Sequence, residues 1–172
     1  MHQIEFVDLG LSVKWATCNL GANLPSEYGD YYSWNDIAYE NKKSKDIRTI
    51  FRRYIAKYRN RVKYFIEDSS LYRLPTFSEF EELLNKCSWV WTECNGINGY
   101  KVIGCNENSI FIPIGGSKDK FFFHFKECGY YWSSSLVDCR NRFAYALFFD
   151  CNVNLMTSNK CDLGHAIRLV KK

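Results

Sequence analysis

The stretch RLPTFSEFEELLNKCSWVWT, residues 73–92, carries the clearest fold signal in the chain. Thr76, followed three residues later by Glu79, matches a capping box, in which each side chain accepts from the other's backbone N–H at a helix start. The residues that follow predict one buried helix face, because apolar side chains recur at helical spacing at Phe77, Phe80, Leu83, Leu84 and Cys87. Residues 89–91 resume an extended pattern, so we expect a helix that leads directly into a strand.

Short extended runs surround this helix. Residues 6–16 have a strand–turn–strand pattern, and the turn signals Asn95-Gly96 and Asn98-Gly99 belong to a predicted β-meander that ends at residue 114. Further strands are expected at 129–135, 143–149 and 164–170. Two more helical segments are expected, a short one at 25–29 and a basic one at 42–65. The sequence therefore predicts an α+β fold with mixed antiparallel sheets and two or three short helices.

Length and hydropathy set further bounds. The 172 residues suit one domain, so we treat 1–172 as a single unit. No run approaches the roughly 18 apolar residues that a membrane-spanning helix needs. Residues 1–5 lack the basic-then-apolar pattern of a signal peptide. We therefore expect no membrane span and, in the chain as given, no export signal.

The net charge of +4 is unevenly distributed. Residues 42–65 hold ten Lys or Arg against Asp46 alone, which gives a local charge of +9. Such a block is typical of proteins that contact nucleic acid or an anionic surface. The apolar residues between Ile47 and Tyr58 also recur at helical spacing, the pattern of a docked amphipathic helix with a solvated basic face. We favour the docked helix and do not expect nucleic acid as a partner, while a protein that binds an anionic surface or nucleic acid through this helix stays an alternative.

The sequence lacks recognisable catalytic and metal-binding motifs. None of the eight cysteines forms a Cys-x-x-Cys pair, and no histidine lies at ligand spacing to any of them. The three histidines, His2, His124 and His165, lie outside the known catalytic motifs. The glycine pair 115–116 lacks the spacing of a phosphate-binding loop. We therefore expect no enzyme activity, no metal site and no cofactor.

Three stretches resemble one known family in combination. VDLGLSVKWATCNLGA (7–22), the capped helix segment 73–92, and the pair GYYWSSS (129–135) and GHAIRLV (164–170) resemble the Bacteroidetes and Fibrobacter paralogous domains. Those domains share a C-type-lectin-like core with the formylglycine-generating-enzyme superfamily. The resemblance implies a C-type-lectin-like fold, and calcium enters only by analogy with that fold. The superfamily's enzymes use a reactive cysteine pair in motifs that this chain lacks, so such an enzyme stays an alternative and not the expectation.

Some members of this family are variable proteins of diversity-generating retroelements, in which a reverse transcriptase rewrites adenines near the end of the gene. The resemblance places the variable region at 137–163, where asparagines and cysteines gather and no period is evident. The residues expected to face a ligand are Arg140, Asn141, Arg142, Phe148, Cys151, Asn154, Met156, Ser158, Asn159 and Lys160. Trp132, Tyr145, Leu147, Phe149 and Arg168 are expected to form the scaffold.

Alternation along 143–149 predicts one face that anchors the core and a second that presents Phe148 to solvent. The resulting hypothesis is a non-catalytic protein that binds an unknown protein or glycan for receptor recognition or adhesion. Its action is expected at a bacterial cell surface or on a phage particle. A long surface loop without any ligand would show the same mixed composition, so that interpretation stays open beside it.

Overall fold

The computed structural model describes residues 4–34, 72–118, 123–124, 127–137 and 142–172. The predicted basic helix at 42–65 lies outside the described residues, as do Arg140 and Asn141 of the predicted binding region.

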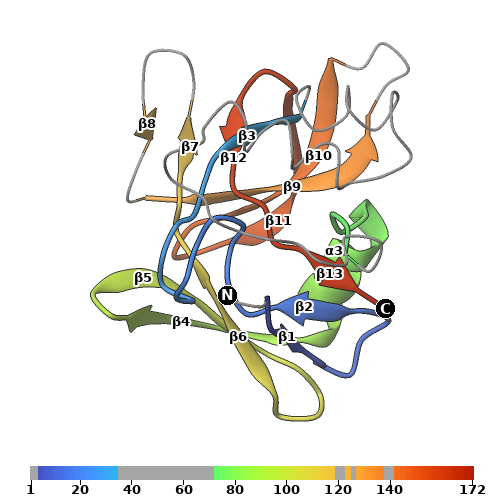
Figure 1. The fold of residues 1–172 in the computed structure, drawn as a ribbon, viewed down its shortest axis with the longest axis vertical. Helices are drawn as coiled ribbons and strands as arrows, with labels where there is room; N and C mark the ends of the chain where they lie inside the picture. Colours follow the sequence, from blue (N-terminus) through green and yellow to red (C-terminus); the bar gives the residue numbers. More distant parts are fainter. Residues whose placement is uncertain (1–3, 35–71, 119–122, 125–126, 138–141) are drawn as a thin grey trace.

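Short strands dominate the described residues, and their arrangement is shown in Figure 1. They form four small sheets, in the orders β1-β2-β13, β11-β10-β9, β3-β12-β7-β8 and β4-β5-β6, and each strand pairing in them is antiparallel. The elements are β1 (Phe6–Val7), β2 (Lys14–Ala16), β3 (Tyr32–Ser33), α3 (Phe77–Lys86), β4 (Ser88–Cys94), β5 (Ile97–Ile103), β6 (Ser109–Pro113), β7 (Ser117–Lys118), β8 (Phe123–His124), β9 (Gly129–Leu136), β10 (Phe143–Phe149), β11 (Asn154–Lys160), β12 (Gly164–His165) and β13 (Val170–Lys171).

The predicted α+β, C-type-lectin-like fold with two or three short helices is wrong, because the described residues are mostly β and hold one helix, α3. The helix expected at 25–29 is a turn. The Glu27 N–H donates to the Leu24 carbonyl at 3.0 Å, and the Glu27 carboxylate accepts from the Asn23 N–H at 2.7 Å. These local bonds close a single turn, and Gly29 follows at φ +72, which stops helical continuation.

The capping box that starts α3 is confirmed. Thr76 Oγ1 accepts from the Glu79 N–H at 3.2 Å, and the Glu79 carboxylate accepts from the Thr76 N–H at 2.7 Å. Arg73 donates to the same carboxylate at 2.7 Å. Burial raises the pKa of Glu79, but the hydrogen bonds from Arg73 and Thr76 outweigh it and the pKa is lowered. The helix start is therefore held by an ionised carboxylate, and Phe80 and Leu83 of the helix are buried.

The predicted β-meander is confirmed as β4-β5-β6. Its first turn is Asn95-Gly96, with φ of 53° and 78°, the backbone conformation that a two-residue hairpin needs and that this dipeptide favours. Trp89 and Trp91 of β4 both pack against Tyr100 of β5, with ring centroids 5.3 Å and 5.0 Å apart. The meander thus presents an aromatic face to the rest of the molecule.

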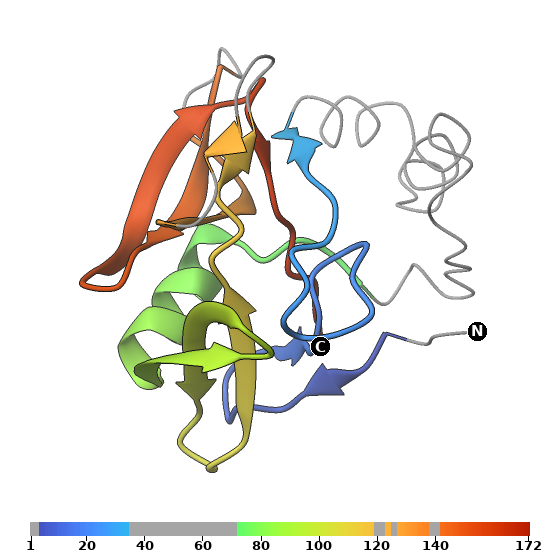
Figure 2. The same ribbon diagram turned by 90° about the vertical axis from the view of Figure 1, so that its left-hand side faces the viewer.

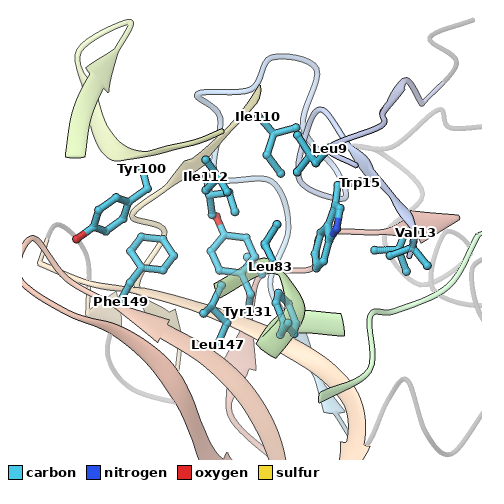
Figure 3. Packing of buried hydrophobic residues seen from close by; sticks show 14 of the residues in the cluster. Leu9, Val13, Trp15, Leu83, Tyr100, Ile110, Ile112, Tyr131, Leu147 and Phe149 are labelled. Carbon is cyan, nitrogen blue, oxygen red and sulfur yellow. The ribbon is translucent and has the colours of Figure 1, made fainter. Parts of the chain in front are cut away.

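The main core lies where the meander, α3 and one face of the β9-β10-β11 sheet meet. Figure 3 shows Phe149 of β10 beside Tyr100, and Leu147 near Tyr131 and Leu83. A second cluster covers the opposite face of the same sheet and contains Trp132, Ala144 and Ala146. The central strand β10 is therefore packed on both faces.

The residues expected to form the scaffold are buried or half-buried in the structure. Trp132, Leu147, Phe149 and Arg168 are fully buried, and Tyr145 is half-buried against Phe77, with ring centroids 4.6 Å apart. The Arg168 guanidinium donates to the Ala16 carbonyl at 3.0 Å and the Phe111 carbonyl at 2.9 Å. It thereby joins β2 and β6, the first sheet and the meander, through hydrogen bonds from its two terminal nitrogens, while its buried Nε has no partner among the described residues.

Candidate ligand-binding surface

Within the variable region expected at 137–163, where the sequence shows no period, the structure contains the full strand β11. β11 pairs with β10 residue for residue, from Phe143 opposite Lys160 to Phe149 opposite Asn154. The turn between them is held by Asp150, whose carboxylate accepts from the N–H groups of Asn152 at 2.7 Å and Val153 at 2.9 Å. The hairpin is thus a rigid structure, and Figure 2 shows it along the outer margin of the molecule, with its turn protruding.

Burial separates the two strands of this hairpin sharply. In β10 four residues are buried, namely Ala144, Ala146, Leu147 and Phe149, whereas in β11 no residue is. β11 lies at the edge of the sheet and β10 at its centre. The packing of the core therefore constrains β10 strongly and β11 weakly.

The backbone register decides which groups of β11 point outward. The Cys161 N–H donates to the Arg142 carbonyl at 3.0 Å, and the Asp150 N–H donates to the Val153 carbonyl at 2.9 Å. Hydrogen-bonded pairs alternate along an antiparallel ladder, so the pairs at Leu155, Thr157 and Asn159 also bond to β10. The N–H and C=O groups of the alternate residues, from Asn154 to Lys160, point away from the sheet.

A row of three partly exposed side chains crosses the sheet at one level. Phe148 of β10 lies directly opposite Tyr130 of β9 on one side and Leu155 of β11 on the other. The rings of Tyr130 and Phe148 are 5.0 Å apart, and Leu155 is 44% exposed. This Tyr130–Phe148–Leu155 row is an apolar strip that neighbouring strands hold in place, a suitable contact for an apolar ligand group.

A buried histidine supports the polar end of the same face. His165 is fully buried, and its ring lies 5.0 Å from that of Tyr130 and 4.1 Å from that of Trp132. Its Nδ1 lies 3.0 Å from the Gly164 carbonyl, which places the proton on Nδ1, so Nε2 accepts from Asn159 Nδ2 at 3.1 Å. Burial lowers the pKa of His165 to about 3, which keeps the ring neutral near pH 7.

The predicted ligand-facing residues do not share one surface. Phe148 and Asn159 lie on the face of the row, and both are half-buried. Four others, Asn154, Met156, Ser158 and Lys160, alternate onto the opposite face of β11, where Met156 packs against the main core. Cys151 lies exposed in the turn, and Arg142 lies exposed just before β10.

The expectation that one face of β10 points to solvent is corrected by the structure. Ala144 and Ala146, on the same face as Phe148, are fully buried in the second core cluster. Phe148, near the end of the strand, is half-buried. The two alanines share their cluster with Tyr32 of β3 and with Ile167 and Leu169. Trp132 Nε1 donates to the Tyr32 carbonyl at 2.8 Å across this contact.

Sequence reasoning missed Tyr130 and Leu155 as members of the surface. Tyr130 belongs to the strand expected at 129–135, outside the expected variable region, and Leu155 is an apolar residue in a stretch without alternation. A search for residues that pair across strands with Phe148 would have found both, but it needs the register of three strands, which the local pattern does not contain.

Two of the described thiols, Cys87 and Cys128, are held in the protonated form. Cys18, Cys87, Cys94, Cys105, Cys128 and Cys151 are free thiols. Burial raises the pKa of Cys87 to about 11 and also raises that of Cys128, so both stay protonated near neutral pH and are poor nucleophiles. Within the described ranges, no group of three or more His, Cys, Asp or Glu side chains is arranged to hold a metal ion.

The chain matches no protein-family model, no curated protein and no solved structure. Among the helices that the structure describes, none is long and apolar enough to cross a membrane.

Proposed function

We propose that this protein is a non-catalytic ligand-binding domain that holds a protein or glycan on the Tyr130–Phe148–Leu155 row. The observation that carries the proposal is the contrast within one hairpin. β11 has no buried residue, yet it pairs along its whole length with a strand that is anchored on both faces. A strand of this kind presents side chains such as Leu155 to a ligand, although Met156 also packs against the main core.

The chemistry of the row favours a ligand with an apolar face and polar edges. Tyr130 and Phe148 offer rings for stacking or apolar contact, and Leu155 extends the strip to the sheet edge. Thr157 and Asn159 follow Leu155 on the same face of β11 and provide hydrogen-bonding groups. Because the strands fix these side chains before binding, little conformational entropy is lost when the ligand binds.

Diversification of this surface is the second part of the proposal, and it rests on the family resemblance. A gene segment that is rewritten at random needs a protein region whose side chains can change without unfolding the chain. β11 and the turn at 150–153 meet that need, since none of their side chains is fully buried. On this proposal the domain recognises a receptor or adheres to a surface, at a bacterial envelope or on a phage particle.

Deep sequencing of the gene across a population of its source cells tests diversification. We expect substitutions in the codons for 151–160, at positions where the unmutated gene copy carries adenine, with Leu155 among the varied residues. The matched control lies inside the expected variable region 137–163. The codons for four buried residues of β10 should stay constant, namely those for Ala144, Ala146, Leu147 and Phe149. A population with one uniform sequence, or with changes spread evenly over 71–163, would contradict the proposal.

A further inference from the structure

We infer that the free edge of β11 pairs with β11 of a second copy of this chain. In this dimer the two strands run antiparallel about a two-fold axis at Thr157, and the two three-stranded sheets join into one. The inference goes beyond the proposed function, because it concerns the backbone edge of the strand and needs no ligand.

The two edges of the β9-β10-β11 sheet differ. At the β9 edge the Trp132 N–H donates to the Ala166 carbonyl at 3.1 Å, and the Ala166 N–H donates to the Tyr130 carbonyl at 3.2 Å. At the β11 edge, the outward N–H and C=O groups of Met156 and Ser158 bond to nothing in the described part of the chain. One edge is thus closed by the chain itself, and the other is left as a template for a further strand.

β11 also lacks the features that usually protect such an edge. Its seven residues, NLMTSNK, include no proline, and Lys160 at the very end is their only charge. Its pairing with β10 runs without a bulge, so the strand is not bent away from an approaching partner. By comparison β4, an edge strand of the meander, carries the exposed carboxylate of Glu93 within its length.

The strand is complementary to itself. The outward-pointing residues Asn154, Met156, Ser158 and Lys160 are symmetric about Thr157. A two-fold axis there sets Met156 opposite Ser158 of the second copy, and Asn154 opposite Lys160 of the second copy. All seven residues of the strand then lie opposite a residue of the second copy. The outward N–H and C=O groups of each strand meet those of the other. The two lysines lie at opposite ends, about 20 Å apart at roughly 3.3 Å per residue, so no like charges meet.

Joining the sheets places two binding surfaces together. A two-fold axis perpendicular to the sheet keeps the same face of each copy on the same side. Both Tyr130–Phe148–Leu155 rows then lie on one continuous face. If the proposed function holds, the dimer presents its ligand surface twice, and a ligand repeated on a cell surface would be bound with avidity.

The experiment compares Ser158→Pro with Ser158→Ala by sedimentation equilibrium of the full chain without any ligand. Proline removes an N–H that points away from β10, so the hairpin keeps its own bonds while each copy loses a donor to the other. Alanine removes the hydroxyl but keeps the N–H. We expect a dimer for the wild-type chain and for Ser158→Ala, and at least a tenfold weaker dimer for Ser158→Pro.

A second variant tests the register and does not depend on the proline variant folding. In the inferred dimer Thr157 lies opposite itself in a non-hydrogen-bonded pair, with Cβ atoms about 4.5–5.5 Å apart. Thr157→Cys should therefore form an intermolecular disulfide on mild oxidation, well above the level of the wild-type cysteines, while Leu155→Cys should not.

Three results would overturn the inference. They are a wild-type chain that stays monomeric up to hundreds of micromolar, a dimer that Ser158→Pro leaves intact, and a Thr157→Cys chain that cross-links no better than Leu155→Cys. None of these concerns ligand binding, and the sequencing result does not concern dimerisation, so each proposal fails separately.

Discussion

β10 and β11 are equal in length and paired throughout, yet they make opposite contributions to the molecule. β10 lies between two core clusters, and its alternate residues fill both of them. Within the described part of the chain, β11 is bonded along one side only, and it buries no residue. The comparison teaches that the choice of side chains in a strand is constrained more by the segments that cover its faces than by its backbone pairing. The reason is that burial, and not the hydrogen-bond ladder, dominates the loss of stability when a side chain is replaced.

The largest expected effect tests this difference at one cross-strand pair. Phe149→Ala should lower the free energy of unfolding by about 3–5 kcal/mol, since the ring is fully buried among Trp89, Tyr100 and Tyr131. Its partner across the ladder is Asn154, where Asn154→Ala should change stability by less than about 0.5 kcal/mol. Urea denaturation measures both, and similar losses at the two positions would break the comparison.

An acid titration tests the buried histidine behind β11. The pKa of His165 is about 3 in the folded chain, below the usual value of 6.5, so the unfolded state binds the proton first. Stability present above pH 6.5 is therefore lost as the pH falls toward 3, by about 1.4 kcal/mol for each pH unit at most.

The matched variant for this titration is His165→Gln, which does not titrate and keeps a group that can bond to Asn159. Between pH 6.5 and 5, before most carboxylates titrate, the wild-type midpoint in urea should fall more steeply than that of the variant. Parallel curves would show that His165 is not a buried neutral ring, and the support of Asn159 by His165 would then need revision.

A final comparison concerns two leucines on neighbouring strands. Leu155 of β11 is 44% exposed, and Leu155→Ala should cost less than about 1 kcal/mol. Leu147 of β10 is fully buried, and Leu147→Ala should cost about 2–5 kcal/mol. Thermal unfolding of the two variants at one protein concentration sharpens the comparison. A loss at Leu155 as large as that at Leu147 would mean that the row belongs to the core.

Local chemistry made α3 and the meander predictable. Thr76 and Glu79 bond to each other's backbone within one turn, and Asn95-Gly96 adopts the hairpin turn by its own backbone preference, so neither depends on distant residues. The helix predicted at 25–29 was wrong for a related reason. At 25–29 the Glu27 side chain binds the preceding backbone, and a turn satisfies that bond as well as a helix would.

β11 escaped prediction because an edge strand that is partly exposed on both faces needs no alternation of apolar and polar residues. Its partner β10 was found as a strand, but the exposure of its Phe148 face was misjudged, since Ala144 and Ala146 look neutral in sequence and are covered only by distant segments. Of the candidate site, Phe148 and Asn159 were named in advance, while Tyr130 and Leu155 emerged from the register.

The sequence by itself determined the position of α3, the meander, the strand at 143–149 and the burial of residues such as Trp132 and Phe149, because turn chemistry, helix caps and apolar patterns act over a few residues. Only the tertiary structure decided that 154–160 is an edge strand, that Tyr130, Phe148 and Leu155 form one row, and that one sheet edge stays open. Those features depend on register and on which faces other segments cover, and both are set by contacts between residues far apart in the chain.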